Sequence, residues 1–471
     1  MNKFIDRVPE LETLQKEYDK DRSSLVILYG RRRVGKTPLI AEFIKNKPFL
    51  FFLATEESEQ QNRIAFQKKA AELTGNVLLA ESTSLSWDAL FRTIGTTAFL
   101  QKPVIVIDEF QYLGKSNPVF LSILQRIWDE YLGKASVMLI LCGSLISMME
   151  SQTLAYSSPL YGRRTAQIRL TQIPFRYYHE FYPEKSIKEL IEFYSVTGGV
   201  PKYIELFSEA EELYECIQKT VLNRASFLYE EPYFLLQQEV EDIGTYFSVI
   251  RAIAAGNSKM SAIASILGAK ATSLSKYLHT LIDLDILERE VPVTEENPEK
   301  SKKGLYRIKD NYLKFWFMFI YPNRSFIETG NSEFLLDIIK CGLAERHTAF
   351  VFEDICREQM WLLNVNGRLP FLLQKVGRWW SKDEEIDVVG LGVQKQIIFG
   401  ECKYRSSAVG TDVFYKLKEK AGKVIWNLED REEWFILFSL NGFTKEMEKL
   451  AEEQKRIILI GVSFFHRGRK V

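Results

Sequence analysis

The sequence lacks a net charge and any regular spacing of its cysteines. Its 62 basic and 62 acidic residues cancel, so no global field attracts polyanions, and any nucleic-acid binding would have to come from local patches. No two cysteines form a C-x-x-C pair, which argues against a zinc site and fits free thiols in a reducing cytoplasm. The cysteines are Cys142, Cys216, Cys341, Cys356 and Cys402.

The chain also lacks a long hydrophobic run. Its longest apolar stretch, residues 137–149, is too short to span a bilayer and is broken by Gly143 and Ser144. The first residues, M-N-K-F-I-D-R, do not form a signal peptide. We therefore expect a soluble, cytoplasmic protein with no membrane partner. Its 471 residues, 46% of them hydrophobic, are enough for three or four folded domains.

Residues 30–37 are G-R-R-R-V-G-K-T and match the phosphate-binding pattern G-x-x-x-x-G-K-[ST]. An apolar strand is expected before them, over 25–29, and a helix after them, over 39–45. Such a turn directs backbone N–H groups into one concavity, and the helix N-terminus adds partial positive charge, so a polyphosphate is held there. Lys36 would reach the β- and γ-phosphates of ATP, and the Thr37 hydroxyl would bind Mg²⁺. The predicted nucleotide-binding residues are Gly30, Arg31, Arg32, Arg33, Val34, Gly35, Lys36, Thr37 and Pro38.

Pro38 departs from the usual residue after the phosphate-binding threonine. Proline is tolerated in the first turn of a helix, but it has no N–H to donate. It also biases the preceding residue, Thr37, away from helical backbone angles. The N–H at this position commonly faces the α-phosphate, so we expect weaker nucleotide binding, although not its loss.

Residues 103–109, P-V-I-V-I-D-E, predict a buried parallel strand that ends in two acids. Ligands of parallel sheets bind at the carboxyl ends of the strands. Asp108 is therefore expected beside Thr37, where it would hold Mg²⁺ through water, and Glu109 is the candidate to orient the attacking water. Strands that alternate with helices over 1–173 predict an α/β ATPase core with a parallel sheet.

Two further features of this core have alternative interpretations. Ser144 follows a predicted strand and either contacts the γ-phosphate or caps the next helix. Arg163 and Arg164 lie on a predicted loop, and an arginine that reaches the γ-phosphate stabilises transition-state charge. Surface arginines are the equally open alternative, and the sequence does not indicate which of the two would act.

The next two segments are predicted to be mainly helical. Residues 174–240, with a helix over 202–229, predict a lid that closes on the nucleotide. Residues 241–325 predict a helix-turn-helix followed by a β-hairpin, which is a winged-helix arrangement. Its third helix and the lysines of its hairpin loop could contact DNA, and a role as a protein-interaction module is equally open. These residues are Thr272, Ser273, Ser275, Lys276, Lys300, Lys302 and Lys303.

Residues 335–471 predict a second α/β domain. A helix carries Glu353, and the two strands of the hairpin that follows carry Asp387 and then Glu401 and Lys403. Residues i and i+2 of a strand share a face, so Glu401 and Lys403 point the same way. Carboxylates on such a face bind Mg²⁺, and a lysine stabilises hydroxide and phosphate charge. The prediction is a nuclease site with the three acids as metal ligands and the lysine as a catalytic group. A solvated strand end is one alternative, and a nuclease fold without activity is another.

Together these strings resemble the prokaryotic AAA+-type ATPases of the STAND group, often called the archaeal ATPase family. The similar strings are G-R-R-R-V-G-K-T, V-I-D-E-F-Q-Y-L, C-G-S, Y-G-R-R-T and G-G-V-P-K-Y. The F-E-D-I-C, R-W-W, E-I-D-V-V and G-E-C-K-Y-R strings resemble a PD-(D/E)xK nuclease core in the domain of unknown function that follows this ATPase.

The resemblance implies two more nucleotide-binding residues. The N-terminal F-x-x-R-x-x-E-L box, which contains Arg7, lies near the adenine in that family, and Pro201 of the G-x-P segment would approach the base. The strand-tip motif that commonly ends in a second serine ends here in Leu145.

The expected function is a switch that binds Mg²⁺ and ATP, hydrolyses ATP and changes domain arrangement with the nucleotide. Its expected output is DNA binding and metal-dependent cleavage of nucleic acid. One rival is a non-catalytic, ATP-dependent regulator that binds DNA or protein and has an inactive nuclease fold. A second rival is a ring-shaped motor ATPase, so a protein partner and further copies of the chain both stay open.

Overall fold

The computed structural model describes residues 4–461 of the chain. Residues 1–3, at the start of the chain, and 462–471, which end the domain predicted over 335–471, lie outside the described residues. The chain forms two compact units. The first contains the residues up to 173 and the segments 200–202 and 235–241, and the second contains 174–199, 203–234 and 242–471. No helix in the described part of the chain is long and apolar enough to cross a membrane.

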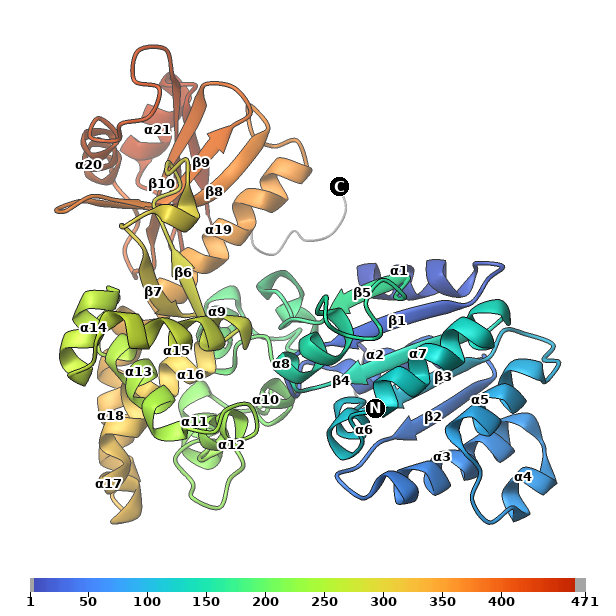
Figure 1. Ribbon diagram of the computed structural model, residues 1–471. Coiled ribbons are helices and arrows are strands. Elements are labelled where there is room, and N and C mark those ends of the chain that lie inside the picture. The colour runs from blue at the N-terminus through green and yellow to red at the C-terminus, as the bar shows by residue number, and fades with distance from the viewer. Residues whose placement is uncertain (1–3, 462–471) are drawn as a thin grey trace. The chain divides into compact units, whose positions relative to one another are not determined.

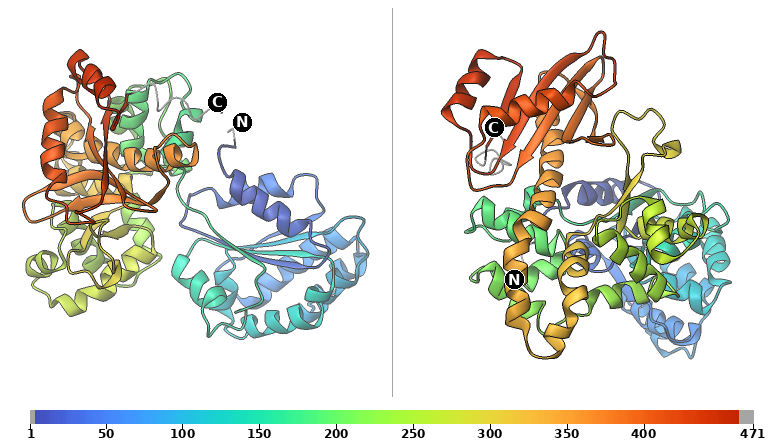
Figure 2. Two further views of the ribbon diagram at one scale, coloured as in Figure 1. Left: turned by 90° about the horizontal axis from the view of Figure 1, so that it is seen from above. Right: turned by 90° about the vertical axis from the view of Figure 1, so that its left-hand side faces the viewer.

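The first unit is built on a parallel sheet with the strand order β2-β3-β4-β1-β5 (Figure 1). Strands β1, β3 and β4 are buried along their whole length, because helices cover both faces of the sheet (Figure 2). The strands are β1 (Ser24–Tyr29), β2 (Phe49–Leu53), β3 (Val104–Asp108), β4 (Met138–Gly143) and β5 (Ala166–Arg169). The predicted parallel α/β core is confirmed, and β5 is a strand that the sequence did not reveal.

Capping side chains mark the starts of α3, α4 and α5 in this unit. Helix α5, for example, starts after Ser86, whose hydroxyl accepts a hydrogen bond from the backbone N–H of Ala89. Its buried face consists of Trp87, Leu90, Phe91 and Ile94, at helical spacing. The helices are α1 (Val8–Tyr18), α2 (Lys36–Ile44), α3 (Glu59–Thr74), α4 (Val77–Glu81), α5 (Trp87–Thr96), α6 (Gln111–Ser116), α7 (Phe120–Glu130) and α8 (Ile146–Met149).

The helix predicted over 202–229 is wrong. The chain instead forms two short helices there, α10 (Pro201–Glu205) and α11 (Leu213–Thr220). The Tyr182 hydroxyl donates to the carbonyls of Ile204 at 2.7 Å and Phe207 at 3.2 Å, so a tertiary partner takes carbonyls that a continuous helix would use. The neighbouring helices are α9 (Ile187–Thr197) and α12 (Glu231–Gln237).

The helices and hairpin predicted over 241–325 are present in the second unit. Gly268, with a φ of +59°, makes the turn between the second and third helices. The hairpin pairs its two strands in antiparallel register. These elements are α13 (Ile243–Ala254), α14 (Met260–Leu267), α15 (Ala271–Asp283), β6 (Leu287–Glu290) and β7 (Leu305–Ile308). The helices that follow are α16 (Asn311–Phe315), α17 (Arg324–Glu328), α18 (Ser332–Leu343) and α19 (Ala349–Val365).

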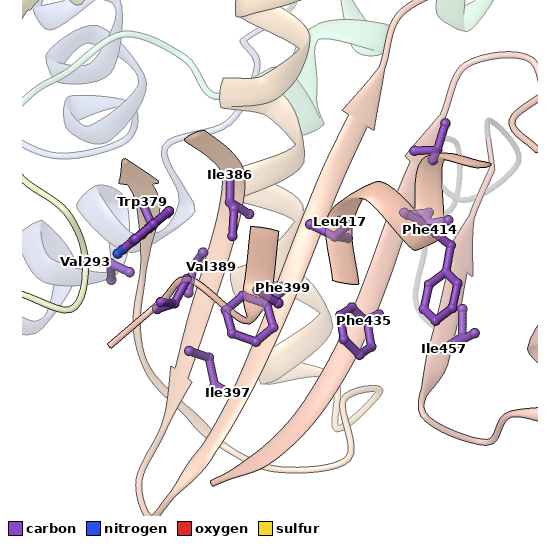
Figure 3. Packing of buried hydrophobic residues seen from close by; sticks show 14 of the residues in the cluster. Val293, Trp379, Ile386, Val389, Ile397, Phe399, Phe414, Leu417, Phe435 and Ile457 are labelled. Carbon is purple, nitrogen blue, oxygen red and sulfur yellow. The ribbon is translucent and has the colours of Figure 1, made fainter. Parts of the chain in front are cut away.

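A second five-stranded sheet ends the chain, with the order β12-β11-β10-β9-β8. β9 pairs antiparallel with both β8 and β10, whereas β10, β11 and β12 run parallel. Its core packs Phe399, Phe414 and Phe435 together and also takes in Val293, which follows the β6 strand and lies beside Trp379 (Figure 3). The elements are β8 (Leu373–Trp380), β9 (Glu385–Gly392), β10 (Gln396–Lys403), α20 (Thr411–Ala421), β11 (Glu432–Ser439), α21 (Lys445–Glu453) and β12 (Ile457–Ile460).

Candidate functional site

The loop between β1 and α2 depends on its two glycines. A Cβ on Gly30 would lie 2.2 Å from the backbone oxygen of Leu170, so no side chain fits there. Gly35 has a φ of +95°, a left-handed value that side chains disfavour. Arg33 also has a positive φ, of 69°. The sequence therefore builds a tightly wound loop at the carboxyl end of β1, in the position where the motif predicts phosphate binding.

The Lys36 side chain is buried and turns back over this loop. Its Nζ donates to the carbonyl of Gly30 at 2.8 Å and to that of Arg31 at 3.0 Å. Burial lowers the pKa of this amine, while Cys142, Glu109 and Asp108 oppose that shift. Among the described residues, the hydrogen bonds of this amine go to backbone carbonyls, and the contact of Lys36 with a polyphosphate stays a prediction.

Asp108 lies beside Thr37, as the sequence predicts. The Thr37 hydroxyl and a carboxylate oxygen of Asp108 are 3.4 Å apart. Asp108 ends β3 and is buried. These oxygens fit Mg²⁺, which prefers carboxylate, hydroxyl and water ligands. The described residues contain no group of three or more His, Cys, Asp or Glu side chains arranged to hold a metal ion, so phosphate and water oxygens would complete such a site.

Glu109 is held by two polar side chains at the end of the sheet. The Ser144 hydroxyl lies 2.8 and 2.7 Å from its two carboxylate oxygens, and the Gln111 amide also donates to it. Ser144 does not cap the following helix, since Leu145 occupies that position without a side-chain bond. Gln111 was not predicted as a site residue. A Cβ on Gly143 would lie 2.3 Å from the Gln111 amide oxygen, so only glycine leaves room for it there.

Arg7 and Pro201 both lie next to the phosphate-binding loop. Arg7 is buried and donates to the carbonyl of Val34 at 3.0 Å and to that of Thr171 at 2.6 Å. Pro201 belongs to the first unit, and its Cγ would lie 3.7 Å from a Cβ on Gly35. The structure thus brings both residues to the loop, and their contacts with the nucleotide stay a prediction.

The arginines predicted at the site form two groups, those within the phosphate-binding loop and the pair Arg163 and Arg164 outside it. Arg32 donates to the Tyr112 hydroxyl at 3.3 Å, and Arg31 is buried within the loop. Arg163, by contrast, forms a two-pronged ion pair with Asp129, at 2.9 and 2.8 Å. Arg164 packs near the Tyr161 ring. No contact joins Arg163 or Arg164 to the phosphate-binding loop among the interactions described, so their assignment stays a prediction.

Comparison with known proteins agrees with this geometry. Residues 4–207 match an ATPase domain found predominantly in Archaea, and residues 316–423 match a family described as archaeal and bacterial proteins of unknown function. An uncharacterised protein of Methanocaldococcus jannaschii is 35% identical over 459 residues, which cover 94% of this chain and 100% of that one. The chain belongs to this family of archaeal-type ATPases.

Two further proteins are similar to parts of this chain. An uncharacterised ATP-binding protein of the same organism is 52% identical over 44 residues, 9% of this chain and 75% of that one. The structure of a Walker-type ATPase from Pyrococcus abyssi is similar with a TM-score of 0.51 at 19% identity, covering 67% of this ATPase and 96% of that chain. This second likeness concerns the fold alone.

The acids predicted in the carboxyl-terminal domain of the ATPase gather around Glu401. Its two carboxylate oxygens lie 2.7 Å from the Lys403 amine and 3.3 Å from the amine of Lys420, which comes from α20. The predicted common face of Glu401 and Lys403 is therefore confirmed. Asp387 accepts the backbone N–H of Cys402 at 2.9 Å, and Lys420 is a basic neighbour that the sequence did not reveal.

Glu353 lies in the same charged environment. Burial and the nearby charge of Asp387 raise the pKa of the Glu353 carboxyl to about 8. Burial and Glu401 likewise raise the pKa of Asp387 to about 6. The structure thus brings the four predicted residues of this site together, as a cluster of acids compensated by lysines. The described residues, these three acids among them, contain no group arranged to hold a metal ion, so the assignment of Glu353, Asp387 and Glu401 as metal ligands stays a prediction without support from this arrangement.

Several side chains of α15, the third helix of the 241–325 segment, are exposed to solvent. Thr272, Ser273 and Lys276 are exposed, and Ser275 is half-buried. In the hairpin loop, the Lys303 amine pairs with Glu295 at 2.7 Å, whereas Lys300 and Lys302 are exposed. The geometry leaves room for a DNA contact through α15 without establishing one.

Proposed function

We propose that this archaeal-type ATPase binds ATP with Mg²⁺ between Lys36, Thr37 and Asp108 and acts as a nucleotide-controlled switch. The observation that carries the proposal is the approach of Thr37 to Asp108, at 3.4 Å, beside a buried lysine that bonds only loop carbonyls. This arrangement supplies backbone donors, one cation and oxygen ligands at the carboxyl end of a parallel sheet.

Each residue has a definite part in this proposal. Lys36 binds the terminal phosphates, and Thr37 and Asp108 hold Mg²⁺, which would neutralise the charge of the phosphates. Glu109 orients the attacking water, and the hydroxyl of Ser144 keeps its carboxylate in place. Arg163 would reach the site only if it left Asp129.

The experiment compares Lys36→Ala with Lys45→Ala, an exposed lysine at the other end of α2 that pairs with Glu42. We expect wild type and Lys45→Ala to bind and hydrolyse ATP with Mg²⁺, and Lys36→Ala to lose both. Unchanged ATPase activity in Lys36→Ala would exclude this loop as the active site. Light scattering with and without ATP also separates the switch from the motor, since nucleotide-dependent hexamers would favour a ring.

A second candidate function is metal-dependent cleavage of nucleic acid by the carboxyl-terminal domain. The gathering of Glu353, Asp387, Glu401 and Lys403 favours it, because an acid cluster with a lysine suits hydrolysis of phosphodiesters. The rival is a regulator with an inactive nuclease fold. The salt bridges from Lys403 and Lys420 to Glu401 are as consistent with this rival as with an active nuclease site.

Cleavage of labelled single- and double-stranded DNA with Mg²⁺ or Mn²⁺ distinguishes these two functions. The matched control for Lys403→Ala is Lys395→Ala, a lysine just before the same strand that pairs with Asp430 at the surface. Cleavage that is lost only in Lys403→Ala, and that depends on ATP, would establish a nucleotide-gated nuclease. ATP binding without cleavage would favour the regulator.

DNA binding through α15 is tested separately. Lys276 is exposed on this helix, and removal of its charge in Lys276→Ala should weaken DNA binding and lessen its salt dependence. If wild type binds no DNA, or if DNA binding is unchanged in that variant, the segment 241–325 would be assigned to protein interaction.

A further inference from the structure

Arg7 joins the phosphate-binding loop to the segment in which the chain leaves the first unit. Its Nη2 donates to the carbonyl of Val34 in the loop, at 3.0 Å, and to the carbonyl of Thr171, at 2.6 Å. Thr171 lies just before Ile173, the last residue of the first unit before the chain enters the second. One guanidinium therefore holds two pieces of backbone that are far apart in sequence.

Arg7 is itself fixed in place. It is buried, and its Nη1 donates to Glu10 at 3.4 Å. Its backbone carbonyl accepts from the N–H of Leu11 at the start of α1, at 2.9 Å. The φ values of Asp6 and Arg7, 63° and 75°, are left-handed, a conformation that residues other than glycine rarely adopt. If either carbonyl moves, the other must follow or a buried charge loses a hydrogen bond, which is costly.

The segment that Arg7 holds also packs directly on the loop. The backbone oxygen of Leu170 occupies the space that a Cβ on Gly30 would need, and the N–H of Leu170 donates to the carbonyl of Tyr29 at 2.7 Å. The segment 170–171 thus contacts the loop at its start, through Gly30, and near its end, through Arg7 and Val34. Phosphates bound by the loop would restrain these same backbone groups.

We propose that Arg7 is a positioning residue that transmits occupancy of the phosphate-binding loop to the segment 170–173, where the chain leaves the first unit. Bound phosphates hold the loop, the Val34 carbonyl holds the guanidinium, and the guanidinium holds the Thr171 carbonyl. The segment therefore opens less often when nucleotide is bound. This inference rests on the proposed nucleotide site and supplies a physical connection for its switch.

The test is amide hydrogen exchange of the full chain, with and without a non-hydrolysable ATP analogue and Mg²⁺. In wild type we expect the analogue to slow exchange about tenfold both in 30–37 and in 170–173, the effect of about one hydrogen bond to a charged group. Arg7→Met keeps a long unbranched side chain without donors, so the analogue should still slow exchange in 30–37 but no longer in 170–173. Arg22→Met removes an exposed arginine of the same unit and should behave as wild type.

A milder variant guards against misfolding of the first. Arg7→Lys keeps the charge with fewer donors, and the analogue should slow exchange in 170–173 by about threefold. Calorimetry with the analogue shows which variants bind nucleotide. Wild-type slowing of 170–173 in both Arg7 variants, or loss of nucleotide binding in both, overturns this inference while the nucleotide site stands. So does slowing in wild type that is confined to 30–37. If wild type binds no nucleotide, the proposed function is overturned together with the inference.

Discussion

Arg307 and Asp354 join the β6–β7 hairpin to helix α19 through two parallel hydrogen bonds, at 2.9 and 2.7 Å. Arg307 also pairs with Glu288 at 2.5 Å and Glu290 at 3.0 Å within the hairpin. Asp354 pairs further with Arg357, which donates to the backbone carbonyl of Asp387 at 2.9 Å. The hairpin of the 241–325 segment is thus tied to the helix and strand that carry the acid cluster.

The first prediction concerns the stability that this pair provides. Asp354→Asn should lower the free energy of unfolding by about 2–3 kcal/mol. That is less than the roughly 3–5 kcal/mol for breaking a fully buried pair, because 34% of the Asp354 side chain is exposed. Urea denaturation measures this loss of unfolding free energy. Asp337→Asn, which removes the partner of Lys340 in an exposed pair, should cost less than about 1 kcal/mol. Equal losses of unfolding free energy in the two variants would contradict the conclusion that the Arg307–Asp354 pair stabilises the fold more than an exposed pair does.

The contribution of the Arg307–Asp354 pair to the free energy of unfolding depends on pH, and its direction follows from the pKa of Asp354. Burial would raise the pKa of Asp354, but Arg307 and Arg357 outweigh it and hold the pKa well below its ordinary value. A lowered pKa adds stability above the unfolded-state pKa, and that stability is lost as the pH falls below about 4. Asp354→Asn should therefore show a smaller loss of stability than wild type between about pH 4 and pH 2.

Residues close together in sequence gave the most accurate predictions. The loop 30–37 and the acids that end β3 were predicted because each motif occupies one short string with an obvious strand beside it. The hairpin that carries Asp387 and Glu401 was likewise predictable from alternation and a turn. The short edge strand β5 was not, because its sequence, A-Q-I-R, has one buried residue and no periodic pattern.

Residues that come from distant parts of the chain were missed. Gln111 and Lys420 join their sites through tertiary contacts, and each is a common surface residue type without a motif. Arg307 was missed for the same reason, since its partner on α19 follows 47 residues later. The break between α10 and α11 depends on the Tyr182 hydroxyl, which local propensity cannot reveal.

The next prediction separates the two roles of acids at the ATPase site. Glu109→Gln should lower kcat for ATP hydrolysis by about a hundredfold or more, because an amide cannot accept a proton from water. The dissociation constant for ATP should stay within about threefold of wild type. Steady-state kinetics and calorimetry measure these quantities, with the exposed Glu130→Gln as control. A loss of binding that matches the loss of rate would assign Glu109 to nucleotide binding instead.

Ser144→Ala resolves whether this serine acts on Glu109 or on the nucleotide. Because its hydroxyl bonds both carboxylate oxygens of Glu109, we expect kcat to fall about tenfold with KM unchanged. A direct contact with the γ-phosphate would instead raise KM and weaken ATP relative to ADP. The double variant with Glu109→Gln should be no slower than Glu109→Gln alone if the serine works through Glu109.

Pro38→Thr should strengthen nucleotide binding. Pro38 lies in the first turn of α2 and is exposed, so a replacement residue meets no steric barrier and restores an N–H there. We expect the dissociation constants for ATP and ADP to fall about threefold to tenfold, the range for one hydrogen bond to a charged group. Pro38→Ala supplies the same N–H without a hydroxyl and should gain as much. No gain in either variant would show that the missing donor has no effect.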